Sequence, residues 1–332
     1  MIPKIKVKIA IVVFSLIWAA TSLAQVDRFQ KLGVTLDADS EHSVEFWKKV
    51  YGDYSTKDFV LHDPLDLFHV YGVYPGETLA TKARKELKKG LSARIQQGLR
   101  DRLVIADEIS RNYLPRMEEL LAEEGVPAEL ARLPFVESSF DREARSKVGA
   151  TGIWQFMPKT ASRDLRVTSA IDERYDPLKA TRAAARFLRR NHDAFQSWGL
   201  AVMAYHQGPG LVQKAITKLK TRDPVRIMRE FKDPNFQFAS RNYLYEFLAM
   251  VDIGHKLDGK LPTFITISFP KEVTMKEILS RYHVDETTTR VLNPHFRGPI
   301  WSNKASIPAH YPVRLGGITL EEFRKLQYSG TQ

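Results

Sequence analysis

The pattern of hydrophobic and polar residues predicts helices through the middle of the chain. Leu114 to Glu124 is amphipathic, and from Asp176 to Phe195 alanines and other apolar residues recur at helical spacing between basic residues. Leu200 to Tyr205 is apolar on every side, which is typical of a buried helix. A further amphipathic helix is predicted from Asn242 to His255. Residues 104–257 are therefore predicted to form an all-α domain of about eight helices with no strong strand.

The pattern changes after Gly259. Thr263 to Ser268 alternates β-branched and other residues and predicts a strand. Short helices are predicted at Met275 to Tyr282 and at Glu286 to Leu292, and a returning strand at Ala305 to Ile307. The predicted fold class is mainly α, with a small C-terminal α/β module.

The first 24 residues have the organisation of a secretory signal peptide. Three lysines precede an apolar run from Ile9 to Ala20, and the small residues Ser22 and Ala24 follow it. The run is about half of the roughly 20 residues that span a bilayer. Cleavage after Ala24 and export to the periplasm or cell envelope are expected, and an uncleaved anchor is the alternative.

Residues 25–95 give mixed signals. Residues 37–41 resemble the start of a calcium loop, but His42 stands where the required glycine belongs, so a calcium site is excluded. A helix crowded with lysine and arginine is predicted from Leu79 to Arg102. Its basic side chains form either a solvated helix face or a patch that binds the cell wall.

Composition narrows the chemistry. Hydrophobic residues make up 43% and charged residues 27%, as in ordinary globular proteins. The chain has no cysteine, which excludes disulfides, thiol catalysis and a lipid-modified N-terminal cysteine. A formal charge of +11 favours anionic surfaces such as cell wall or lipid head groups, and export argues against nucleic acid. No His-Glu-x-x-His, Gly-x-Ser-x-Gly or phosphate-binding loop occurs, and neither a metal nor a cofactor is expected.

The segment Leu133 to Phe140 places a carboxylate, Glu137, between apolar residues. Burial disfavours the charged form of a carboxyl group and raises its pKa, as a general acid at neutral pH requires. The alternative is a glutamate on the polar face of an ordinary helix.

Two later motifs favour the catalytic interpretation. Gly149 to Pro158 combines two glycines with Trp154, Gln155 and Met157, which offer apolar surface and an amide to a sugar. Ala204-Tyr205-His206 then ends a buried helix beside a Gly-Pro-Gly turn.

The motifs that carry a family resemblance are, in order, Glu137-Ser138, the Gly152 to Pro158 block, Ala204-Tyr205-His206 and Tyr243. By these motifs, residues 95–260, approximately, resemble the family-23 lytic transglycosylases. These enzymes share the goose-type lysozyme fold, and the D-type membrane-bound branch is the most similar. The resemblance implies a lysozyme-like helical catalytic domain that cleaves peptidoglycan.

The resemblance also implies roles. Glu137 would protonate the glycosidic oxygen between N-acetylmuramic acid and N-acetylglucosamine, then accept the C6 hydroxyl proton as a 1,6-anhydro ring closes. Most glycosidases need two carboxylates, but one suffices where the substrate's acetamido group stabilises the transition state. The predicted substrate-binding residues are Ser138, Ser146, Gly152, Trp154, Gln155, Met157, Tyr205, His206 and Tyr243.

The chain departs from the family pattern in two places. His206 replaces an asparagine, although neutral imidazole also both donates and accepts. Ala239-Ser240 replaces a Glu-Thr pair. Two other functions stay open: a muramidase using Asp172 or Asp176 as a second carboxylate, and a non-catalytic protein that binds the cell wall.

Four parts are therefore expected along the chain. They are a signal peptide at 1–24, a helical or irregular region at 25–95, a lysozyme-like transglycosylase domain at 96–260 and a small module at 261–332. The last resembles a degenerate LysM-type wall-binding module or the linker before one; a packing domain without ligand is the alternative.

Overall fold

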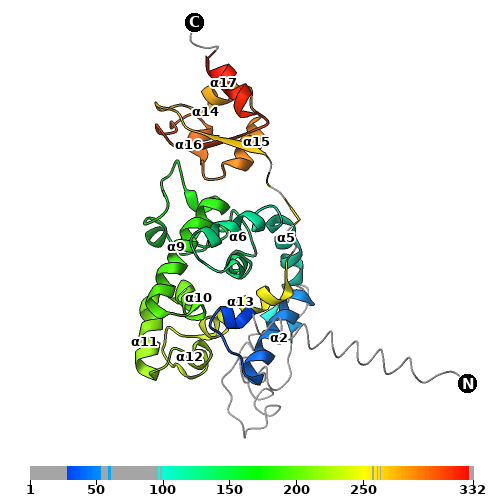
Figure 1. The fold of residues 1–332 in the computed structure, drawn as a ribbon, viewed down its shortest axis with the longest axis vertical. Coiled ribbons are helices and arrows are strands. Elements are labelled where there is room, and N and C mark those ends of the chain that lie inside the picture. The colour runs from blue at the N-terminus through cyan, green and yellow to red at the C-terminus, as the bar shows by residue number, and fades with distance from the viewer. Residues whose placement is uncertain are drawn as a thin grey trace, which may run out of the picture. The chain divides into compact units, whose positions relative to one another are not determined.

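The computed structural model describes residues 28–53, 59–60, 96–97, 99–255, 258–259, 261 and 263–328 (Figure 1). The predicted signal peptide and most of the predicted helix from Leu79 to Arg102 lie outside these residues. The described chain is mainly helical, as predicted. It divides into two compact units, one of residues 1–103 and 187–254 and the other of residues 104–186 and 255–332. Within the described part, no helix combines the length and apolar character needed to cross a membrane.

The first unit is built around α13 (Phe238–Ile253), the long helix that comes last in its sequence. Its helices are α2 (Ala38–Gly52), the second half of α9 (Pro177–Phe195), α10 (Trp198–Gln207), α11 (Pro209–Leu219), α12 (Pro224–Glu230) and α13. Strands β1 (Phe59–Val60) and β2 (Gln96–Gln97) have two residues each and pair with each other in antiparallel orientation.

Helix α2 packs along α13 through buried apolar and polar contacts. The indole N–H of Trp47 donates to Asn242 Oδ1 at 3.3 Å, and Tyr51 donates to Glu246 at 3.1 Å. Lys48 pairs with Asp252 at 2.5 Å. An N-terminal helix that the sequence pattern did not predict thus fixes the helix that carries Tyr243.

The second unit begins with the helices that precede and follow Glu137 along the chain. These are α5 (Arg100–Ser110), whose first residues belong to the first unit, α6 (Leu114–Glu123), the 3₁₀ turn η1 (Ala128–Arg132), α7 (Leu133–Ser138), α8 (Pro158–Ala161), the 3₁₀ turn η2 (Glu173–Tyr175) and the first half of α9. Helix α6 packs against η1, which leads directly into α7. The loops between α7 and α9 hold the glycine-rich block.

The C-terminal module belongs to the second unit and has an apolar core, to which Ile171 also contributes. In chain order it contains β3 (Phe264–Ile267), α14 (Met275–Tyr282), α15 (Glu286–Leu292), α16 (Gly298–Trp301), β4 (Val313–Gly316) and α17 (Leu320–Tyr328). Strands β3 and β4 are antiparallel, with Phe264 opposite Gly316 and Ile267 opposite Val313.

The predicted returning strand at Ala305 to Ile307 is wrong. Ile307 forms only a single bridge with Val273, and the strand that pairs with β3 is Val313–Gly316. Val313 and Leu315 are buried while Arg314 between them is half-buried, which is the alternation of a strand with one face on the core. The two predicted helices of this module have the bounds of α14 and α15.

Candidate active site

Glu137 occupies the penultimate position of α7, a short helix anchored in the core. Leu133, Pro134 and Phe135 are buried, whereas Glu137 is half-buried. The Phe135 ring stacks on His255 with ring centres 3.9 Å apart, and His255 is hydrogen-bonded to Asp107 at 3.0 Å. A helix of this length gains little from its own backbone hydrogen bonds, so packing fixes its position.

The end of α7 is held by Ser138. Its hydroxyl lies 3.0 Å from the carbonyl oxygen of Ile153 and 3.2 Å from that of Pro134. Ser139 and Phe140 follow with left-handed φ angles of 51° and 58° and end the helix. Ser138, predicted to bind substrate, therefore connects α7 to the glycine-rich block.

That block forms a tight turn. The backbones of Thr151 and Phe156 are paired by two hydrogen bonds of 3.2 Å, and the Gln155 N–H donates to the Gly152 carbonyl at 3.0 Å. Gly152 has φ +74°, and a Cβ there would lie 2.0 Å from the Arg174 carbonyl oxygen. The sequence therefore needs glycine at this position both for backbone angle and for space. We call residues 151–156 the site turn.

Gln155 lies at the end of the site turn with its side chain half-buried. Its φ is +47°, and its amide N–H₂ donates to the Gly152 carbonyl at 2.8 Å. This bond fixes the orientation of the side chain. Met157 follows directly and is 39% exposed.

Trp154 does not take the role predicted for it. Its ring is fully buried, and its N–H donates to Thr181 of α9 at 2.9 Å. A ring with no accessible surface cannot offer a face to a sugar, so the expectation of a stacking surface at Trp154 is wrong. The tryptophan instead anchors the site turn on α9.

Ser146 closes a second turn beside the first. Its Oγ accepts from the Ala150 N–H at 2.9 Å, and its backbone N–H donates to the Ala150 carbonyl at 2.8 Å. Val148, at the tip of this turn, is 75% exposed. The substrate-binding role of Ser146 stays a prediction.

Arg174 is the residue of this region that sequence reasoning did not single out. It is buried and forms a two-pronged pair with Asp172, with distances of 2.9 and 2.7 Å. Its remaining donors reach the carbonyls of Gly149 at 2.9 Å and Phe156 at 3.1 Å. One side chain thus holds both ends of the segment that contains the site turn. Only a guanidinium has enough N–H donors in one plane to bind Asp172 and both carbonyls at once.

The two acids considered for a hydrolytic mechanism are both used structurally. Both oxygens of Asp172 accept from Arg174. Asp176 is fully buried: one oxygen accepts from two N–H groups at the start of α9, and the other from His295 and Arg314. Burial alone would raise the pKa of Asp176, but the Arg314 charge and the His295 hydrogen bond hold it well below its ordinary value. Neither carboxylate is available as a catalytic base.

Three predicted residues lie in the first unit. Tyr205, near the end of α10, is half-buried, with its ring edge-on to Phe187 at 5.5 Å. His206 stacks on the buried Tyr243 of α13, with ring centres 4.2 Å apart and planes 18° apart. Gly208, with φ +83°, lets α11 begin at Pro209, so the Gly-Pro-Gly motif joins two helices.

His206 is exposed as a residue, but loss of hydration around its ring lowers the pKa of the imidazole below its ordinary 6.5 and favours the neutral form. A neutral imidazole has one donor and one acceptor nitrogen, as the family's asparagine amide has a donor and an acceptor. At the second departure, Ala239 is exposed, and the carbonyl of Ser240 accepts from Gln207 at 3.2 Å.

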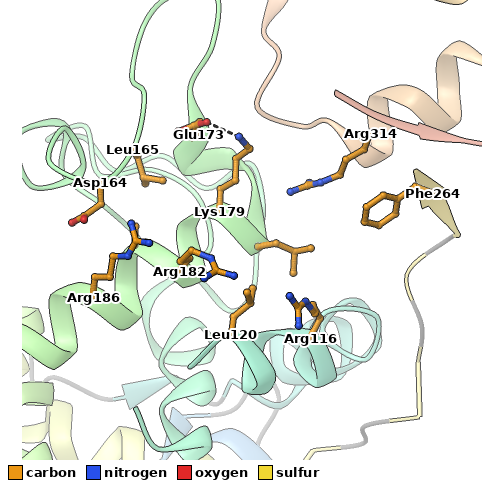
Figure 2. A pocket seen from close by; sticks show the side chains of 12 residues that line it. Arg116, Leu120, Asp164, Leu165, Glu173, Lys179, Arg182, Arg186, Phe264 and Arg314 are labelled. Atoms are coloured by element: carbon orange, nitrogen blue, oxygen red, sulfur yellow. Dashed lines mark hydrogen bonds and ion pairs between the residues drawn. The ribbon is translucent and has the colours of Figure 1, made fainter. Parts of the chain in front are cut away.

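A pocket of about 390 Å³ lies elsewhere in the second unit, and Figure 2 shows the charged side chains around it. The five cations among its lining residues are Arg116, Lys179, Arg182, Arg186 and Arg314. Each is already paired with a carboxylate, at distances between 2.6 and 3.1 Å. The pocket therefore has little net charge to attract an anion, and no predicted site residue lines it.

The fold and site define a mainly helical protein whose candidate site is built on one carboxylate at the end of a short helix. Residues 117–227 match the family described as "Transglycosylase SLT domain". The match confirms the resemblance to lytic transglycosylases over this segment.

Individual proteins are also similar to parts of the chain. The membrane-bound lytic murein transglycosylase D of Escherichia coli K12 is 36% identical over 143 residues, which cover 42% of this chain and 31% of that protein. A transglycosylase of enterobacteria phage PRD1 is 39% identical over 82 residues, covering 25% and 29% of the two chains. The crystal structure of the 70 kDa soluble lytic transglycosylase Slt70 of Escherichia coli matches with a TM-score of 0.37 and 21% identity, covering 44% and 25%. The chain spans about a third of the length of the first of these relatives.

Proposed function

We propose that this protein is a lytic transglycosylase that acts on peptidoglycan with Glu137 as its acid and base. It cleaves the β-1,4 bond between N-acetylmuramic acid and N-acetylglucosamine and forms a 1,6-anhydro end. The observation that carries the proposal is the SLT domain at 117–227, with Glu137 inside it on a helix packed into the core.

The reaction needs a proton donor that later becomes a base. Glu137 first gives its proton to the bridging oxygen, and the glycosidic bond breaks. Its carboxylate then takes the proton of the C6 hydroxyl, whose oxygen attacks C1 of the same sugar. The structural use of both Asp172 and Asp176 supports this one-carboxylate route over hydrolysis by a pair of acids.

The proposed substrate contacts are residues that the family resemblance assigns to sugar binding. Gln155 within the site turn and Met157 directly after it keep accessible surface, and Ser146 lies in the neighbouring turn. Tyr205, His206 and Tyr243 provide aromatic rings and hydrogen-bonding groups from α10 and α13. Ser138, Gly152 and Trp154 act by holding these elements in place.

We place the protein in the cell envelope, with residues 1–24 as an export signal. This location gives access to peptidoglycan, the only partner that the proposal requires. The proposed parts are a region at 25–95, the transglycosylase domain at 96–260 and the module at 261–332, which binds glycan if it acts as a LysM-type unit.

Product analysis tests the function directly. Purified peptidoglycan sacculi are digested with the protein, and the released fragments are identified by mass spectrometry. Anhydro-muropeptides are expected. Fragments with reducing ends would instead indicate a muramidase, and the absence of any release would indicate a binding protein.

The role of Glu137 is tested with Glu137→Gln, which keeps the shape of the side chain and removes its proton chemistry. Release is expected to fall by at least about 100-fold. Glu119→Gln is the matched control, because Glu119 is an exposed acid of α6 and should leave release unchanged. Full activity of Glu137→Gln would refute this assignment.

A further inference from the structure

The segment 170–177 lies between the site turn and the C-terminal module. On one side, Arg174 holds the carbonyls of Gly149 and Phe156. On the other, the N–H of Asp172 donates to the His295 carbonyl at 2.9 Å, and Arg297 N–H donates to the Ala170 carbonyl at 2.9 Å. Segment 170–177 is therefore hydrogen-bonded both to residues 149–156 and to the C-terminal module.

Asp176 is the centre of the contact with the C-terminal module. Its Oδ2 accepts from Arg314 of β4 at 2.6 Å and from His295 Nδ1 at 2.8 Å. Arg314 also donates to the Leu292 carbonyl at 3.0 Å. A fully buried carboxylate is costly unless it is paired, and here both partners come from the module.

Further contacts surround this centre. Ile171 forms a bridge with Phe296, and the Arg297 guanidinium lies 3.7 Å above the Tyr175 ring. Tyr311 donates to Glu173 at 2.5 Å, and Lys179 reaches the same Glu173 oxygen at 2.6 Å. Lys179 and Arg314 also line the pocket of Figure 2, with Glu173 bonded to Lys179. The module is thus joined to segment 170–177 by backbone bonds, ion pairs and aromatic contacts together.

We propose that Arg314 and His295 are positioning residues for the site turn: the C-terminal module, through Asp176 and Arg174, sets the geometry of residues 149–156. Arg314 is far from the site turn along the chain, but few contacts connect the two in the fold. From Arg314 it runs to Asp176, along two residues of backbone to Arg174, and across to the carbonyls of Gly149 and Phe156. The relevance of this path to catalysis rests on the proposed function, whereas the mechanical coupling does not.

Loss of Arg314 would leave the Asp176 carboxylate buried beside a neutral histidine. His295 cannot replace the missing charge easily, because burial lowers its pKa in spite of the hydrogen bond to Asp176. Its Nε2 is also buried without a hydrogen-bond partner among the described residues, so a proton there would be unsatisfied. The segment 172–176 must then shift or take in water, and Arg174 moves with it.

Hydrogen exchange measured by mass spectrometry on the full chain tests the coupling. In Arg314→Met, amide exchange in the peptide that covers 149–156 is expected to be about 10-fold faster. Arg314→Lys keeps the charge beside Asp176 and should restore most of the protection. Lys325→Met is the control, because Lys325 belongs to the same module but is exposed, and its ion pair among the described residues is with Glu321 on α17.

Enzyme kinetics give the second measurement. Release of muropeptides by Arg314→Met should fall about 10-fold and be recovered mostly in Arg314→Lys, whereas Lys325→Met should match the unmodified chain. Unchanged exchange at 149–156 in a folded Arg314→Met would overturn the proposal, whatever its activity. Faster exchange with no activity in any variant would leave the coupling standing and count against the proposed function.

If Arg314→Met does not fold, His295→Phe is measured instead. This change removes the neutral donor to Asp176 and leaves the ion pair with Arg314. A smaller but measurable acceleration of exchange at 149–156 is expected. Protection equal to that of the unmodified chain would contradict the positioning role of the module.

Discussion

Gly152 shows how a single residue constrains the candidate site. Its φ of +74° disfavours any L side chain, and a Cβ would lie 2.0 Å from a backbone oxygen that has no rotamer to change. We expect Gly152→Ala to lower the free energy of unfolding by about 2–5 kcal/mol, from left-handed strain and overpacking together. Urea unfolding followed by circular dichroism measures this loss.

Gly52→Ala is the matched control for that change. Gly52 is the last residue of α2, and a Cβ there has no neighbour within 4 Å. Because alanine favours a helix, the control should change stability by less than about 1 kcal/mol, in the stabilising direction. Equal losses in the two variants would mean that the contact with the Arg174 carbonyl is not decisive.

At the scale of elements, helices with strong periodicity were predictable from sequence. The helix expected at Leu114 to Glu124 differs from α6 by one residue, and α14 and α15 have the predicted bounds. Strand β4 was missed because it has only four residues and a central arginine. Its Val-Arg-Leu alternation was the available signal.

The site was only partly predictable for a related reason. Gly152 and Gln155 indicate a turn, but a turn has no periodicity that tells which side chains point inward. Trp154 therefore looked like a ligand surface and is a core residue. Arg174 was not singled out, because only the fold shows that it reaches two carbonyls 18 and 25 residues away.

The start of α2 provides a prediction at this scale. Asp37 caps the helix by accepting from the Ser40 N–H at 3.0 Å, and it also pairs with Arg229 at 2.6 Å. Asp37→Ala should cost about 1 kcal/mol of unfolding free energy, as lost N-caps do. Asp37→Asn keeps a cap and loses an exposed ion pair, so its cost should be smaller. Urea midpoints compare the two, and an equal cost would assign the stabilisation to the ion pair.

At the scale of the whole molecule, the titratable groups with shifted pKa values affect stability in separate pH ranges. His206 and His295 both have a lowered pKa, caused chiefly by loss of hydration. As the pH falls below about 6.5, these histidines bind protons in the unfolded chain before they do so in the folded chain. Their contribution to the free energy of unfolding is therefore complete above that pH and is lost below it. Asp176 and Glu173 also have a lowered pKa, because nearby cations and hydrogen bonds outweigh burial. Their contribution to stability begins to be lost only below about pH 4 and disappears as the pH falls through their lower pKa values in the folded chain.

The melting temperature should therefore fall between pH 7.5 and 5.5, where only the histidines among these groups change their charge. His206→Asn removes one of them and should make that fall shallower when it is measured by calorimetry. His283→Asn is the control, because His283 is exposed and has a left-handed φ of 50° that asparagine tolerates well. It should leave the slope unchanged. Identical slopes for His206→Asn and the unmodified chain would show that the imidazole beside Tyr243 is as free to accept a proton in the folded chain as in the unfolded one.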